Sequence, residues 1–69
     1  MKTIDASGRS CPEPVLMAKK GLEESPNGIV IMVDNAIAVE NITRFVQNKG
    51  YKIEKKMDNG LFSLEITRS

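Results

Sequence analysis

The pair Asn59-Gly60, set between two stretches of alternating polarity, constrains the fold of this chain more than any other feature. Asn-Gly is a preferred pair for a two-residue type I′ turn, because both central residues of that turn need a positive φ. The flanking stretches, 51–57 and 61–67, are therefore predicted to form an antiparallel hairpin with one apolar and one polar face. The turn sets the register, which pairs Met57 with Phe62, Lys55 with Leu64 and Ile53 with Ile66 on the apolar face.

The chain before the hairpin alternates between strand and helix patterns. Residues 2–5 have the alternating polarity of a short strand, and apolar residues at helical spacing then run from Pro12 to the breaker at 25–28. The next stretch, 29–33, is β-branched without alternation, which is typical of a strand buried or nearly buried on both faces. A strand, a helix and a second strand are therefore predicted in that order.

A second helix is predicted after Asp34 and Asn35, since both residue types make good N-caps. It is expected to end with Gly50 as its C-cap. The whole chain, 1–69, then forms one domain in the order β-α-β-α-β-β, an α/β two-layer sandwich with two helices on one face of a four-stranded sheet. The apolar stripe of the second helix consists of Ala38, Val39, Ile42, Phe45 and Val46.

The composition excludes several classes of chemistry. The chain has 69 residues, one cysteine and no histidine. No internal disulfide can form, and the commonest metal ligand and general base is missing. We therefore expect no metal site, no cofactor and no hydrolytic activity of the Ser/His or Cys/His kind.

The charge and the aromatic content argue against nucleic acid as a partner. Ten basic and nine acidic residues leave a net charge of +1, which is too balanced for binding dominated by phosphate contacts. The three aromatic residues, Phe45, Tyr51 and Phe62, fall in periodic apolar patterns, so few aromatic side chains remain on which nucleic-acid bases could stack. No apolar run has membrane length, so no membrane partner is expected and a cytoplasmic location is predicted, which suits an unpaired thiol.

The single cysteine, Cys11, stands directly before a predicted helix start. Pro12 suits the first helical position and biases the preceding residue toward extended angles, so both effects make Cys11 the N-cap. Its sulfur would then lie at the positive end of the helix dipole, which favours the thiolate. Arg9 would add to this effect, whereas the carboxylate of Glu13 would oppose it. A moderately activated thiol is predicted.

Pro14 falls at the third position of the same helix and is expected to strain the first turn. With prolines at 12 and 14, Glu13 alone among the first three helical residues can donate a backbone N–H, which suits one sulfur anion better than a phosphate. The competing interpretation is a buried, inert cysteine, since cysteine is among the most often buried residue types. The proline-marked position outside the apolar stripe favours chemistry at Cys11.

Each of the other charged residues has two possible roles. Asp5 could tune Cys11 or brace the loop after the first strand, and bracing is favoured because a carboxylate beside a thiolate is repulsive. Lys19, Lys20 and Arg44 could dock an acidic partner, but such residues more often form a solvated helix face.

These residues together resemble the TusA/SirA/YedF family of small sulfur-carrier domains. The resemblance runs nearly end to end, and "VDN" with "VENITRFVQNKGY" is similar to the second-helix region of the YedF-type branch. Arg9 and Ser10 depart from the TusA-type pattern, which often has an apolar residue followed by a basic one. The residues that match the family pattern Asp…Gly-x-x-Cys-Pro-x-Pro are Asp5, Gly8, Cys11, Pro12 and Pro14.

The resemblance implies a function that the residue patterns alone do not. Cys11 would accept a sulfane sulfur from a cysteine desulfurase or another donor protein, hold it as a persulfide and pass it to an acceptor protein. It also implies the sheet order 1-2-4-3, and a place in tRNA thiolation for the TusA type or in selenium metabolism for the YedF type. YedF-type proteins usually carry a second domain, so the chain could be a stand-alone member or an excised piece.

Two other classes of function remain open at this point. The same topology occurs in RNA-associated domains, and a fold does not determine a function. A regulatory or interaction module with an inert Cys11 is the other alternative. A steep salt dependence of RNA binding would indicate the first, and a thiol no more reactive than that of an unfolded peptide would indicate the second.

Overall fold

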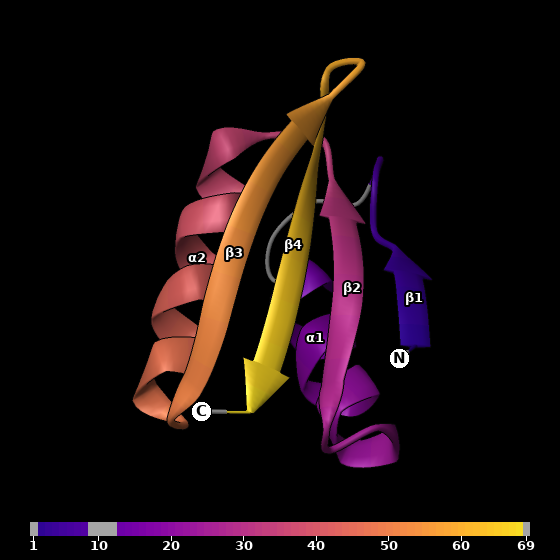
Figure 1. Ribbon diagram of the computed structural model, residues 1–69. Coiled ribbons are helices and arrows are strands. Elements are labelled where there is room, and N and C mark those ends of the chain that lie inside the picture. The colour runs from indigo at the N-terminus through magenta and orange to yellow at the C-terminus, as the bar shows by residue number, and fades with distance from the viewer. Residues whose placement is uncertain (1, 9–12, 69) are drawn as a thin grey trace.

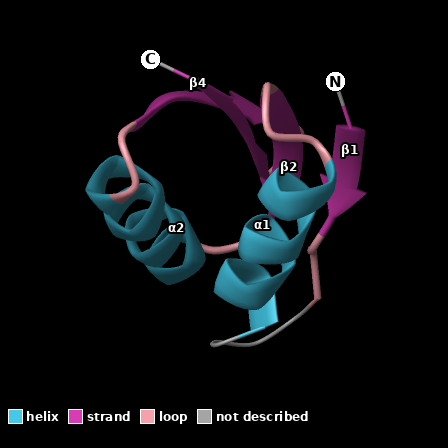
Figure 2. Ribbon diagram, turned by 90° about the horizontal axis from the view of Figure 1, so that it is seen from below, coloured by secondary structure: helices cyan, strands magenta, loops and turns pink. Residues whose placement is uncertain are grey.

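The computed structural model describes residues 2–8 and 13–68 of the chain. The sheet order is β1-β2-β4-β3, in which β1 is parallel to β2 and the other neighbours are antiparallel. Both helices cover the same face of this sheet (Figures 1 and 2). The predicted two-layer sandwich, its element order and its sheet order are therefore confirmed. The elements are β1 (Lys2–Asp5), α1 (Glu13–Glu24), β2 (Gly28–Val33), α2 (Ala36–Asn48), β3 (Tyr51–Asp58) and β4 (Leu61–Arg68).

The hairpin of β3 and β4 has the predicted turn and register. Asn59 and Gly60 have φ of 52° and 81°, as both central residues of a type I′ turn require. The strand pairs include Met57 with Phe62, Lys55 with Leu64 and Ile53 with Ile66. The sheet thus keeps its apolar residues on the face that the helices cover.

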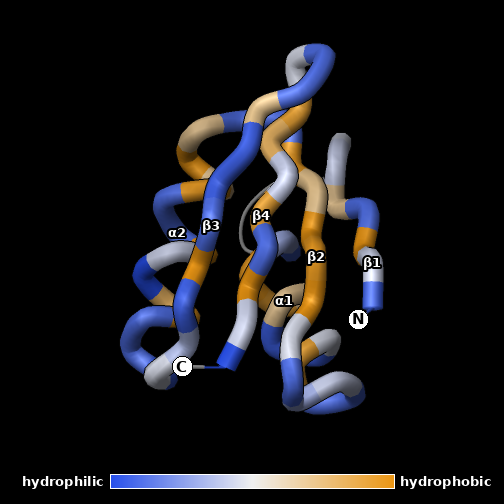
Figure 3. Tube along the Cα trace, in the orientation of Figure 1, coloured by the Kyte–Doolittle hydropathy of each residue, from blue (hydrophilic) through white to orange (hydrophobic). Residues whose placement is uncertain are grey.

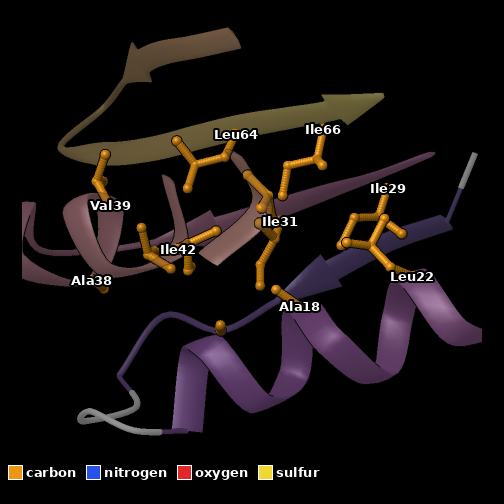
Figure 4. Packing of buried hydrophobic residues seen from close by; sticks show 12 residues of the cluster. Ala18, Leu22, Ile29, Ile31, Ala38, Val39, Ile42, Leu64 and Ile66 are labelled. Carbon is orange, nitrogen blue, oxygen red and sulfur yellow. The ribbon is translucent and has the colours of Figure 1, made fainter. Parts of the chain in front are cut away.

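The core lies between the sheet and the two helices (Figure 4). The central strands β2 and β4 contribute most of its volume, and Figure 3 shows that β2 is far more apolar than the outer strand β3. Each fully buried aliphatic side chain stabilises the fold by about 1.5–3 kcal/mol relative to exposure. The large side chains that are fully buried are Ile29, Ile31, Val33, Ile42, Val46, Leu64 and Ile66.

The prediction that β2 is buried or nearly so on both faces is confirmed for the helix face, and burial is partial on the opposite face. Ile29, Ile31 and Val33 point toward the helices and are fully buried, whereas Val30 and Met32 on the opposite face are only half-buried. The helices cover one face of the sheet, so the second face of its central strand is shielded by neighbouring strands alone.

The ends of the helices agree with the predicted signals except at one position. Asn35 is the N-cap of α2, and its side chain accepts a hydrogen bond of 2.7 Å from the N–H of Ala38. The C-cap is Lys49 and not Gly50 as predicted; Gly50 follows it with a φ of 86°. The helix can end one residue earlier because glycine is the residue that adopts a positive φ most easily after a cap.

Helix α1 lies very close to the first strand. A Cβ at Gly21 would come within 2.3 Å of Ile4 Cδ1 and 3.3 Å of Ile29 Cδ1, so alanine at this position would require the tip of the Ile4 side chain to move. At the end of the same helix, Glu24 forms an ion pair with Lys2 of β1, and this contact lowers the pKa of the Glu24 carboxyl. Neither helix of the described chain combines the length and apolar character needed to span a membrane.

Candidate functional site

The candidate site lies at the edge of the sheet where the two parallel strands end. Strands β1 and β2 run side by side, so the loops that follow them leave from the same edge (Figure 1). The N–H of Ala6 continues the pairing by donating to Met32 O at 2.8 Å. Helix α2 begins directly after β2. This edge therefore brings residues 5–8 close to residues 32–35.

Asp5 binds the loop that follows β1. Its Oδ1 accepts hydrogen bonds from the N–H of Ser7 at 3.0 Å and from Ser7 Oγ at 2.5 Å. The carboxylate thus holds the backbone in a tight turn two residues before the glycine, as Asp side chains commonly do. This geometry agrees with the bracing role that was favoured for Asp5.

Asp34 is a residue whose role sequence reasoning missed. Its Oδ2 accepts a hydrogen bond of 2.8 Å from the N–H of Gly8, and its Oδ1 accepts one of 3.2 Å from Asn35 Nδ2. The Gly8 hydrogen bond, followed by that from Asn35, holds the pKa of the Asp34 carboxyl below its usual value. The sequence showed Asp34 only as a possible N-cap. One signal could have found it. Asp34 directly follows the buried strand β2, and β1, the parallel neighbour of β2, is followed by the loop that contains Gly8.

Gly8 has a φ of 76°, in the left-handed region. A Cβ added there would meet no atom within 4 Å, so the backbone conformation and not the space favours glycine. The Asp34 hydrogen bond fixes this conformation from the other loop.

The central predicted residues, Arg9, Cys11 and Pro12, lie outside the described residues. The chain is described again from Glu13, which is exposed, and Pro14, whose side chain is fully buried. Pro14 is therefore held at the start of α1 by burial of its ring, whereas its predicted role was to strain the first turn. The described residues on both sides of 9–12 are held in place, Gly8 by its hydrogen bond to Asp34 and Pro14 by burial of its side chain.

The three basic residues proposed for docking do not form one patch. Lys19 lines a groove toward α2, whereas Lys20 lines a groove on the β1 side of α1. Arg44 forms an ion pair of 3.1 Å with Glu40 within α2. All three are exposed, and their docking role stays a prediction.

Over residues 2–8 and 13–68, no three acidic side chains gather as a metal ion would require. The carboxylates at the candidate edge have another task, since those of Asp5 and Asp34 both accept backbone hydrogen bonds. Among the described residues, these two carboxylates hold the loop that follows β1 in position.

The Asp34 contact predicts a pH dependence of stability. Because the folded-state pKa is lowered, ionised Asp34 stabilises the fold at pH values above the usual pKa of an aspartate. This contribution is lost as the pH falls further, through the lower folded-state pKa. Asp34→Asn should therefore unfold at lower urea concentration than wild type at pH 7. The difference should shrink toward pH 3 when unfolding is followed by circular dichroism. A difference that stays constant with pH would contradict an ionic contribution.

Three comparisons place the chain among known proteins. A family model described as sulfurtransferase TusA matches residues 2–68. The chain is 46% identical over 55 residues to a Methanocaldococcus jannaschii protein provisionally named as a sulfur carrier, a match that covers 77% of this chain and 73% of that one. It is 35% identical over 69 residues to the sulfur carrier protein TusA of Allochromatium vinosum, with 96% and 91% covered.

A solved structure gives the same picture in three dimensions. The crystal structure of a SirA-like protein from Desulfitobacterium hafniense matches with a TM-score of 0.88 at 39% sequence identity. The match covers 97% of this chain and 96% of that one.

Proposed function

The chain belongs to the TusA sulfurtransferase family, and from this premise we propose that it is a sulfur carrier that holds its cargo as a persulfide on Cys11. The observation that carries the proposal is that Cys11 is the only thiol in the chain. A family of sulfur carriers needs a nucleophilic sulfur, and this chain offers one position for it. The carrier role follows from the family; the persulfide on Cys11 is our inference.

The proposed loading step moves one sulfur atom without net oxidation. The Cys11 thiolate attacks the terminal sulfur of a persulfide on a donor protein. The sulfur–sulfur bond of the donor breaks and leaves the donor as a thiolate, while a new sulfur–sulfur bond forms on Cys11. Unloading repeats the exchange, with an acceptor thiolate attacking the terminal sulfur of Cys11. No oxidant and no cofactor enters either step.

The described residues support this function by positioning the chain on both sides of the cysteine. Asp34 fixes Gly8 on one side through its 2.8 Å hydrogen bond, and the buried Pro14 fixes the start of α1 on the other. The chain has no histidine, so proton transfers would rely on water or on groups of the two partner proteins. Division of the chemistry between the carrier and its partners suits a domain of 69 residues.

The partners of a carrier follow from its chemistry. A donor must present a sulfane sulfur, for which a cysteine desulfurase is the proposed source, and an acceptor protein must remove it. Whether the acceptor leads to tRNA thiolation or to selenium metabolism depends on that protein. A cytoplasmic location of all three remains part of the proposal.

The test is direct loading. The purified chain is incubated with a cysteine desulfurase and cysteine, and its intact mass is recorded without reductant. We expect a gain of one sulfur atom that disappears on treatment with dithiothreitol and does not form when cysteine is omitted. Absence of the gain, while the desulfurase itself carries a persulfide, would contradict a carrier role with this class of donor.

A further inference from the structure

Strand β3 forms the lateral edge of the sheet on the side opposite β1. In the sheet of the described residues, β3 is an end strand, and six of its eight residues are exposed. Such an edge presents unpaired backbone N–H and C=O groups at every second residue. The loops of the candidate site follow β1 and β2, and β1 is the opposite end strand, so a contact at β3 leaves them accessible (Figure 1).

The charges on β3 form an alternating series on its open face. The residues that point away from the helices are Lys52, Glu54, Lys56 and Asp58, with the signs plus, minus, plus and minus. A series that alternates in this way over an even number of positions is complementary to itself when two copies pair antiparallel. The open face of this strand is therefore complementary in charge to the same face of a second copy.

One register uses this complementarity fully. With Lys55 of the two copies at the twofold axis, Lys52 faces Asp58 of the second copy and Glu54 faces Lys56 of the second copy, and both pairs occur twice. A shift by two residues in either direction sets lysine against lysine and acid against acid. Opposite charges directly across a strand pair attract and like charges repel, so the register is specified.

Two features of β3 within a single copy also favour this contact. Glu54 lies directly opposite Glu65 of β4, so its carboxylate has a like charge on its paired side. In the proposed register it gains a lysine on its free side. On the helix face, Met57 is 67% exposed and would lie against Ile53 of the second copy. The contact thus covers one of the few large apolar side chains that the fold leaves exposed.

The helix face sets the geometric limit of the contact. Helix α2 lies alongside β3 (Figure 1), so pairing brings the two copies of α2 near each other. An open groove of about 510 Å³ lies beside β3 on the helix face. Its lining consists of Ala36, Val39, Glu40, Thr43, Arg44 and Gln47 of α2 together with Lys55 and Phe62 of the sheet. Glu40, which pairs with Arg44, lines this groove, so each Lys55 side chain can extend into the groove toward this acid and away from Lys55 of the second copy.

From these observations we propose that the chain forms a homodimer through antiparallel pairing of β3 with β3 of a second copy, which joins the two sheets into one. The proposal does not depend on the function of Cys11. The two candidate sites would lie at opposite ends of the joined sheet, each free to meet a partner.

The test uses two charge reversals measured by sedimentation velocity over a range of concentrations. Wild type should show a monomer–dimer equilibrium. Glu54→Lys alone sets lysine against Lys56, and Lys56→Glu alone sets acid against Glu54, so each variant should dimerise at least tenfold more weakly. An equimolar mixture of the two variants should restore the dimer, because every facing pair on the open face of the mixed dimer is again of opposite sign.

Controls separate this interface from effects on folding. Glu54→Lys replaces the like-charged contact with Glu65 by an attractive one, so circular dichroism should show a fold no less stable than wild type. Lys55→Thr removes the lysine pair at the axis and should tighten the dimer severalfold. A monomeric wild type at millimolar concentration, or a mixture that associates no better than its components, would overturn the proposal.

Discussion

Replacement of Cys11 by serine is expected to remove sulfur loading completely. A hydroxyl is not ionised near neutral pH and cannot attack the sulfur–sulfur bond of a donor persulfide, and no second thiol exists in the chain to take over. In the desulfurase assay, the intact mass of Cys11→Ser should stay unchanged under conditions that load wild type fully. Any sulfur gained by this variant would show that the carrier chemistry does not involve Cys11.

Inorganic polysulfide serves as a second donor in the same experiment, because it needs no recognition by a protein. Wild type should gain sulfur from polysulfide, and Cys11→Ser should not. A wild type that is loaded by polysulfide but not by desulfurases would locate the failure in partner recognition. A wild-type thiol that alkylates no faster than the same residue in a short peptide would instead favour the alternative of an inert cysteine.

The largest effect on folding is expected for Ile31→Ala. Ile31 is fully buried at the centre of β2, where it pairs with Ile4 of β1 and Leu64 of β4. Its side chain points into the space between the sheet and the helices (Figure 4). Truncation at such a site costs about 2–5 kcal/mol, which is a large part of the stability of a small domain. Urea unfolding followed by circular dichroism should show a correspondingly lower midpoint.

Two matched variants test whether burial is the cause. Ile31→Val removes one methylene and should cost about 0.5–1.5 kcal/mol. Leu16→Ala removes a side chain that is 55% exposed and should change the free energy of unfolding by about 0.5 kcal/mol or less. Similar losses for Leu16→Ala and Ile31→Ala would show that the assignment of the core is wrong.

Most of the fold could be predicted from the sequence because its signals are local. The Asn59-Gly60 turn specifies the hairpin register, and Asn35 caps α2 through its own side chain. For 29–33 the predicted burial, complete or nearly so on both faces, is complete on one face and partial on the other for a non-local reason. A run without polar residues shows that both faces tolerate apolar side chains, but not that a second layer covers both faces.

The candidate site could be predicted only in part. The pattern around Cys11 was visible as a motif, and Asp5 could be assigned to the loop because its partner is two residues away. Asp34 was missed because its partner, Gly8, is 26 residues distant. Only the parallel pairing of β1 with β2 brings those two loops together, and that pairing came from the family resemblance and not from the residue pattern.

The close approach of α1 to the sheet predicts which sequence changes should occur together. The space that a methyl group at position 21 would need is occupied by the tip of the Ile4 side chain, a flexible end and not a backbone atom. Among homologous chains, alanine at position 21 should therefore accompany valine or a smaller residue at position 4. The two positions form a coupled pair in which one side chain grows as the other shrinks.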